Sequence, residues 1–298
     1  MALWENGALN EVVIDGILSE VKLQEGTDKN GNPAIYGEYK VRTTNTIDGR
    51  EYKVEIPVRV YQSKITKNKK ENPAYATAMK IMKDYVSIAA GGEEKATAIR
   101  LPEKSTSLQE NFFMSKTTSQ MVFSSGIRAS FVNEISKADI KPGARFKNII
   151  VIGEKTYEVN KDDVETGRLI IKGIIPQWGG KVDVVDFIVE NRRIVDHIDK
   201  NWQKGDTVLV GGYINYTSIV ETKTDDSNTF GEVMQSQNTR SVREYIITGG
   251  HEEPLTEEEG AYSAEDISEA LRERQSRIEE AKKKVSETTR KPTPSFGF

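Results

Sequence analysis

Apolar and polar residues alternate most clearly in two neighbouring segments of the N-terminal third. In residues 51–61, valine or isoleucine occupies positions 54, 56, 58 and 60, and mostly charged or aromatic side chains lie between them. Residues 36–44 alternate with the same period, which predicts two half-buried β-strands joined by a turn at Asp48-Gly49. The outward positions of these two strands are Tyr36, Lys40, Arg42, Lys53, Arg59 and Tyr61.

The segment 165–221 has the pattern of strand, turn, strand, helix and strand. Trp178-Gly179-Gly180 predicts a turn between two β-rich runs, because glycine accepts a positive φ without steric cost. Apolar residues then recur at helical spacing in residues 192–203, which predicts a short helix with Trp202 in the core. This order favours a small closed barrel with a helix at one end.

Residues 7–135 repeat the same order less compactly. Three strands precede a loop of four lysines, a helix that begins at Asn72-Pro73, and further strands between residues 96 and 134. We expect a long loop or hairpin tip at residues 101–118. In the second half we expect a long polar loop at residues 221–239 before a last strand.

Two signals in the second half carry a family resemblance. Gly173 lies in the strand before the turn, and the run Lys204-Gly-Asp-Thr-Val-Leu-Val-Gly-Gly-Tyr-Ile opens the strand after the helix. With the element order, this resembles the oligonucleotide/oligosaccharide-binding (OB) fold of bacterial and phage single-stranded-DNA-binding proteins. The resemblance implies an all-β dominated protein with two tandem OB-fold barrels, each with a short helix, and a C-terminal acidic and helical tail. We expect the domains at residues 7–135 and 144–250, followed by a partly helical, partly disordered tail at 251–298.

Charge is concentrated in that tail. Residues 251–298 hold 12 acidic and 8 basic side chains, so this segment accounts for the whole net charge of −4. The acidic balance therefore does not argue against a nucleic-acid partner for the rest of the chain. We expect a charged helix at residues 267–285, with too little apolar surface to dock firmly.

Composition excludes several kinds of chemistry. The chain has no cysteine and only two histidines, His197 and His251, and it lacks the GxxxxGK[ST] and HExxH motifs. These absences predict a protein that is not an enzyme and that has no cofactor and no metal site. No apolar run is long enough to span a membrane, and the N-terminus does not read as a secretory signal. We therefore expect a cytoplasmic protein, in the host cytoplasm if a phage encodes it.

The positive evidence is for binding of single-stranded nucleic acid. Such binding needs cations for phosphates and flat aromatic faces for unstacked bases, and each stacked base contributes about 1–3 kcal/mol. In the first barrel the predicted contacts are the six outward residues above, the loop lysines Lys64, Lys67, Lys69 and Lys70, and the tip residues Phe112, Phe113 and Lys116. In the second barrel they are Trp178, with Lys181, Tyr213, Tyr216, Arg240 and Arg243 around it.

Two features complicate this prediction. Asp183 and Asp186 lie in the strand after Trp178 and would repel phosphate, so the second barrel is expected to bind weakly or to contact protein. The chain ends in Phe296-Gly297-Phe298, and the bacterial proteins that it resembles recruit partners with a hydrophobic tip after an acidic tail. The resemblance implies that Phe296 and Phe298 contact a polymerase, helicase or recombinase, although a basic helix separates them from the acidic stretch.

The sequence thus predicts a phage-like protein that binds single-stranded DNA with little sequence specificity, protects it during replication, recombination or repair, and recruits partners. One alternative is an OB-fold structural or assembly protein, such as a virion component, whose barrels bind protein. A nucleic-acid-processing enzyme is disfavoured because no set of catalytic side chains is apparent in the sequence.

Overall fold

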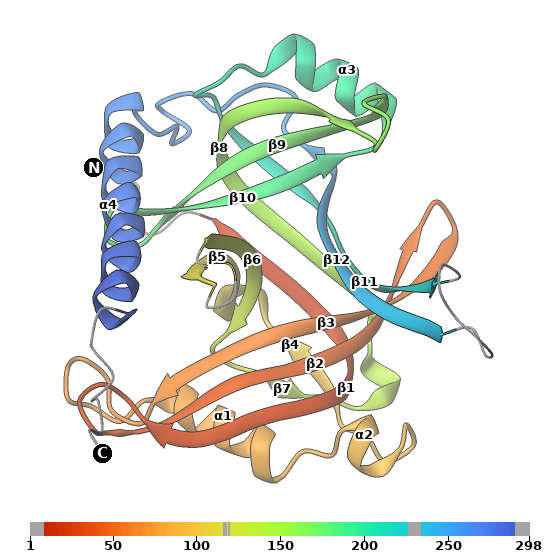
Figure 1. Ribbon diagram of the computed structural model, residues 1–298, viewed down its shortest axis with the longest axis vertical. Helices are drawn as coiled ribbons and strands as arrows, with labels where there is room; N and C mark the ends of the chain where they lie inside the picture. Colours follow the sequence, from red (N-terminus) through yellow and green to blue (C-terminus); the bar gives the residue numbers. More distant parts are fainter. Residues whose placement is uncertain (1–8, 116–117, 119, 226–233, 290–298) are drawn as a thin grey trace, which may run out of the picture.

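The two strands with the clearest alternation are the second and third strands of a three-stranded meander (Figure 1). The computed structural model describes residues 9–115, 118, 120–225 and 234–289. Its strands and helices are β1 (Asn10–Thr27), β2 (Pro33–Ile47), β3 (Arg50–Ser63), α1 (Pro73–Lys83), α2 (Ile88–Gly91), β4 (Ala98–Leu101), β5 (Thr106–Met114), β6 (Met121–Ala129), β7 (Asn133–Glu134), β8 (Gly143–Val159), β9 (Glu165–Gln177), β10 (Lys181–Val189), α3 (Arg192–Asn201), β11 (Thr207–Asp225), β12 (Met234–Gly250) and α4 (Ala264–Thr289). Short 3₁₀ turns follow β4 and β7.

The first barrel is built from β1 to β6. Antiparallel β1, β2 and β3 form the meander, and β3 then pairs in parallel with β6 through Val58 and Ile127. The side chain of Asn10 on β1 accepts from the backbone N–H of Leu108 on β5 and donates to its carbonyl, both at 2.9 Å. This pair of hydrogen bonds links the first strand to the hairpin of β5 and β6.

The second barrel repeats this topology. Antiparallel β8, β9 and β10 form its meander, and β10 pairs in parallel with β12 through Ile188 and Ile246. The ladder between β11 and β8 closes the barrel. The helix predicted after β10 is α3, whose Val195 and Ile198 are buried together with Trp202, as the helical spacing indicated. The predicted fold class is confirmed: two tandem OB-fold barrels, each with a short helix, precede a C-terminal helical segment.

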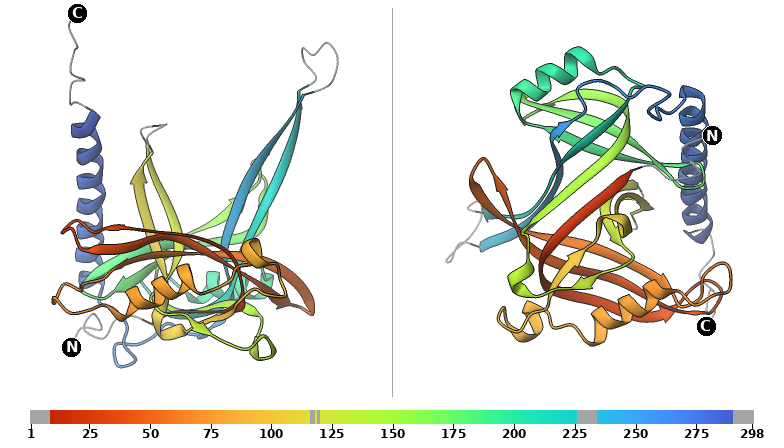
Figure 2. Two further views of the ribbon diagram at one scale, coloured as in Figure 1. Left: turned by 90° about the horizontal axis from the view of Figure 1, so that it is seen from below. Right: turned by 180° about the vertical axis from the view of Figure 1, so that it is seen from behind.

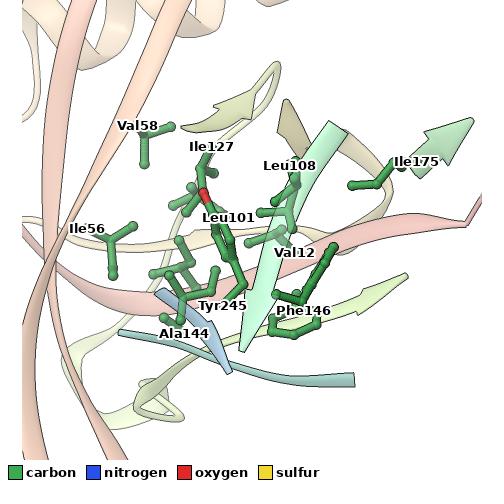
Figure 3. Packing of buried hydrophobic residues seen from close by; sticks show 14 of the residues in the cluster. Val12, Ile56, Val58, Leu101, Leu108, Ile127, Ala144, Phe146, Ile175 and Tyr245 are labelled. Atoms are coloured by element: carbon green, nitrogen blue, oxygen red, sulfur yellow. The ribbon is translucent and has the colours of Figure 1, made fainter. Parts of the chain in front are cut away.

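One hydrophobic core runs through both barrels. Strand β1 of the first barrel pairs with β8 of the second between residues 10–15 and 143–148, so one sheet continues across them. Figure 3 shows Leu108 and Ile127 of the first barrel in the same cluster as Phe146 and Tyr245 of the second. The domain limits at 7–135 and 144–250 stay a prediction.

Two predicted loops are largely β-strand. Residues 106–114 form β5, so within the expected loop at 101–118 only residues 102–105 and the described residues after 114 lack strand structure. The expected loop at 221–239 instead continues β11 to Asp225 and begins β12 at Met234. Polar sequence misled the prediction, because the outer part of a hairpin that projects from a barrel has no buried face and needs no apolar alternation. Figure 2 (left) shows both hairpins extending from the body in the same direction.

The C-terminal helix docks, contrary to expectation. Ile267, Ala270 and Ile278 of α4 are buried, and Tyr262 before the helix is buried beside Val182 of β10. The sequence offered few apolar positions in this helix, but Ala270 and Tyr262 add to the apolar surface that is buried. The helix lies along β10 and β5, so it contacts both barrels (Figure 1).

Candidate nucleic-acid interface

The outward face of β2 and β3 carries the residues that alternation placed there. Val54, Ile56 and Val58 are buried, as predicted. Tyr36 lies directly opposite Tyr61 in the β2–β3 ladder, and 51% of Tyr61 is exposed. The period of two that fills the core therefore also presents two aromatic rings side by side to solvent.

A hollow of about 330 Å³ lies between this face and the hairpin of β5 and β6. We call it the crevice. Its polar and aromatic lining residues are Glu38, Arg59, Tyr61, Gln109, Asn111 and Arg128. Strands β3 and β6 pair over only two positions, and one of them places Arg59 next to Arg128. The parallel pairing required by the barrel thus brings two cations together beside an exposed tyrosine.

Neither arginine of the crevice is neutralised within the part of the chain that the structure describes. No carboxylate lies within ion-pair distance of Arg59 or Arg128 there, although Glu38 is opposite Arg59 in the ladder. Two guanidinium groups without counterions, at the edge of a hollow, can each donate several hydrogen bonds to a phosphate.

Two other predicted cations of this face, Lys40 and Arg42, form ion pairs. Lys40 is 2.8 Å from a carboxylate oxygen of Glu20, and this contact raises the pKa of Lys40. Two N–H groups of Arg42 donate to one oxygen of Glu55, at 3.1 and 2.8 Å. Lys53 is exposed and lines a separate hollow of about 340 Å³ with Arg42. Arg59 at the crevice is therefore free, whereas Lys40 and Arg42 are paired, and Lys53 forms no ion pair within the described residues.

The lysine loop and the β5–β6 hairpin are both exposed. Lys64, Lys67, Lys69 and Lys70 lie on the surface, in a loop where the backbone N–H of Thr66 donates to the carbonyl of Lys70. Phe112 faces Phe123 across the hairpin with ring centroids 6.3 Å apart, and about half of Phe113 and of Phe123 is exposed. The predicted contact Lys116 lies outside the described residues.

The structure does not gather the predicted residues of the second barrel around Trp178. That side chain is 76% exposed on the β9–β10 turn, with exposed Lys181 beside it, at the end of the barrel near α4. Tyr213, Tyr216 and Arg243 lie instead on β11 and β12, on the other side of the molecule (Figures 1 and 2). Phe296 and Phe298 lie outside the described residues, and so does the side chain of Arg240.

Arg243 and Tyr216 form a pair of their own. The Arg243 guanidinium lies 5.1 Å from the centroid of the Tyr216 ring and donates to the carbonyl oxygen of Ser125 on β6. Tyr213 is half-buried, and this burial raises its pKa to about 12. Arg243 thus reaches from the second barrel to the hairpin of the first.

Of the two aspartates that were expected to repel phosphate, Asp186 is exposed and Asp183 lies near α4. Burial raises the pKa of Asp183 to about 6, and the nearby charges are those of Glu110, Arg274 and Arg277. Arg274 of α4 donates from two nitrogens to the two carboxylate oxygens of Glu110 on β5, at 2.6 and 2.5 Å. Asp183 therefore belongs to the contact between α4 and the barrels.

Sequence reasoning missed Arg128, Gln109 and Asn111. The signal for Arg128 was available, since Ile127 and Ala129 alternate with it and are buried. The signal for Gln109 and Asn111 was not, because their segment was interpreted as a loop. Among the described residues no cluster of three His, Asp or Glu side chains could hold a metal ion.

Comparison with known proteins identifies the family. The YorF family model matches residues 8–284. This chain belongs to the YorF family. A search of curated protein sequences found no significant match. No helix in the described part of this YorF-family chain is long and apolar enough to cross a membrane.

Solved structures share the fold of this YorF-family chain. Two are crystal structures of the single-stranded DNA binding protein from Thermus aquaticus, the wild type and a deletion mutant. Each has a TM-score of 0.50 and 12% sequence identity over 84% of this chain. The match covers 94% of the wild-type chain and 97% of the mutant chain. At this identity the likeness concerns the fold.

Proposed function

We propose that this chain binds single-stranded DNA with little sequence specificity and without catalysing a reaction. The observation that carries the proposal is the crevice, where Arg59 and Arg128 lie together without carboxylate partners beside the exposed ring of Tyr61. Phosphates would accept hydrogen bonds from the guanidinium groups of Arg59 and Arg128. Unpaired bases would stack on Tyr61 and on the hairpin phenylalanines. The similarity in fold to a single-stranded DNA binding protein supports this assignment.

The biological setting that we propose follows from this chemistry. A protein that coats unpaired strands would protect them during replication, recombination or repair. The terminal residues Phe296 and Phe298 would recruit a replication or recombination protein. We also propose a phage-like origin and a cytoplasmic location.

A titration of fluorescently labelled oligo-dT, followed by anisotropy at low and moderate salt, tests the proposal. Each charge-assisted hydrogen bond contributes about 1.5 kcal/mol, so Arg59→Ala with Arg128→Ala should weaken binding on the order of a hundredfold. The salt slope of log K should become shallower by about 1.4, since single strands release about 0.7 counterion per phosphate contact. Arg42→Ala is the matched control, because Glu55 already neutralises that arginine.

A second candidate is supported by one observation. In the second barrel Arg168 is neutralised by three carboxylates, which leaves that part of the surface unsuited to phosphate. An assembly protein whose barrels bind protein would have such a surface. If the wild-type chain binds no oligo-dT at low salt, the assembly function replaces the DNA-binding one.

A further inference from the structure

Arg243 is the point at which the second barrel contacts the crevice of the first. It comes from β12, yet its guanidinium donates to the Ser125 carbonyl on β6 and lies over the Tyr216 ring. Both contacts fix the direction of a long side chain that would otherwise sample many rotamers. The side chain is thus held at the boundary between the barrels.

Gly126 marks the centre of this boundary. A Cβ atom added at Gly126 would lie 3.4 Å from Asn111 Nδ2, 3.7 Å from Arg243 Nη1 and 3.8 Å from Arg59 Cδ. Side chains from β3, β5 and β12 therefore surround one backbone position of β6. Because glycine has no side chain there, the guanidinium groups border a space instead of packing on a Cβ.

The electrostatic balance of this boundary is positive. Arg59, Arg128 and Arg243 come together from three strands, and within the described residues none of them forms an ion pair. Like charges held close together repel, and neither a backbone carbonyl nor a tyrosine ring carries a full charge to offset them. Two carboxylates are near: Glu38 lines the crevice, and Glu244 is adjacent to Arg243 but is bound to Arg168.

We propose that Arg59, Arg128 and Arg243 form one phosphate-binding junction, at which a bound strand crosses from the first barrel to the second. This inference rests on the proposed function. A guanidinium group presents paired N–H donors that match a phosphate. Arg59 and Arg128 line the crevice, and Arg243 lies beside Gly126 at its edge, where a strand would leave the first barrel. Asp183 does not oppose this path, because it lies among Glu110, Arg274 and Arg277 at the contact between α4 and the barrels.

The test compares two lengths of oligo-dT on the full chain. One OB fold occupies roughly 4–16 nucleotides, so an oligomer of about 6 nucleotides fits the first barrel and one of about 30 spans both. Arg243→Ala should weaken binding of the long oligomer on the order of tenfold and make its salt slope shallower by about 0.7. Binding of the short oligomer should change less than twofold.

Two further variants serve as controls. Arg193→Ala removes an exposed arginine from α3 of the same barrel and should leave both affinities unchanged. Arg243→Lys keeps the charge but loses the fork of donors, so it should bind the long oligomer with intermediate affinity. If Arg243→Ala unfolds in a thermal melt, the lysine variant carries the comparison.

The outcomes separate the junction from the proposed function. Unchanged binding of the long oligomer by Arg243→Ala, while Arg59→Ala weakens binding, would overturn the junction and leave the function in place. An equal loss for both lengths would also overturn it, because Arg243 would then act within the first barrel alone. If the wild type binds neither oligomer, the proposed function itself fails.

Discussion

Arg59 and Arg168 show how differently the two barrels use the same side chain. Arg168 on β9 contacts Glu158 at 3.1 Å, Glu190 at 3.0 Å and Glu244 at 2.6 Å, and its side chain is only 24% exposed. Arg59 on β3 lines a hollow, and no described carboxylate pairs with it. One arginine is part of an internal charge network, and the other is available to a ligand.

The difference teaches that the number of charges does not locate a binding surface. The chain outside its C-terminal segment has equal numbers of acidic and basic residues. Its outward cations still include free ones, such as Arg59 at the crevice, and paired ones, such as Arg42 and Lys40, on the same sheet. What matters is whether the fold places a carboxylate within reach of each cation.

The largest expected effect is the loss of stability in Arg168→Ala. Three carboxylates would lose their common cation, and the network is half-buried, so the loss should be about 2–3 kcal/mol, between the values for exposed and fully buried pairs. Arg59→Ala should change the free energy of unfolding by less than about 0.5 kcal/mol, because no folded-state ion pair is lost. Urea unfolding of both variants measures the difference. Equal destabilisation would show that Arg59 has a structural role as well.

A smaller effect should appear in the pH dependence of stability. Burial raises the pKa of Asp183 in the second barrel to about 6, above its ordinary value of 3.8. The neutral form is favoured in the folded state, so the contribution of Asp183 to stability is present below about pH 4 and is lost as pH rises through about 6. Asp183→Asn should therefore be more stable than wild type at pH 7.5, by roughly 2 kcal/mol relative to the same comparison at pH 4.5.

Asp28 of the first barrel is the control for this measurement. Hydrogen bonds from the Asn32 side chain and from Ser63 lower the pKa of Asp28 to about 2, so it stays charged throughout this pH range. Its stabilising contribution is lost only as pH falls toward 2. The stability difference between Asp28→Asn and wild type should be constant between pH 4.5 and 7.5. A constant difference for Asp183→Asn as well would mean that Asp183 is charged at both pH values.

Sequence patterns predicted the parts of the fold that have a buried side. Alternation placed Val54, Ile56 and Val58 in the core, and helical spacing placed Trp202 there, because burial constrains which face a residue can occupy. The projecting strands β5, β11 and β12 were missed in part for the opposite reason. The docking of α4 was also missed, since much of it depends on a buried Arg274–Glu110 pair between residues 164 positions apart.

For the candidate site, the sequence predicted which face of a strand each residue occupies, but not which residues it contacts. Alternation showed that Arg42 and Arg59 point outward, and both do. It did not show that Glu55 pairs with one and that Arg128 joins the other, because cross-strand register depends on the turn and parallel partners depend on barrel closure. A register alignment of β2 with β3 would have found the first of these two contacts.

The smallest expected effect comes from releasing a paired arginine. Glu55→Gln removes the carboxylate nearest to Arg42, leaves Glu93 at 3.8 Å, and keeps an oxygen that can accept the Arg42 hydrogen bond. Exposed ion pairs contribute about 0.2–1 kcal/mol, so oligo-dT should bind about twofold to threefold more tightly, with a slightly steeper salt slope. Glu51→Gln is the matched control, because it removes the same charge from the same strand where no described cation pairs with it. An equal gain in both variants would mean that net charge, and not the release of Arg42, sets the affinity of this face.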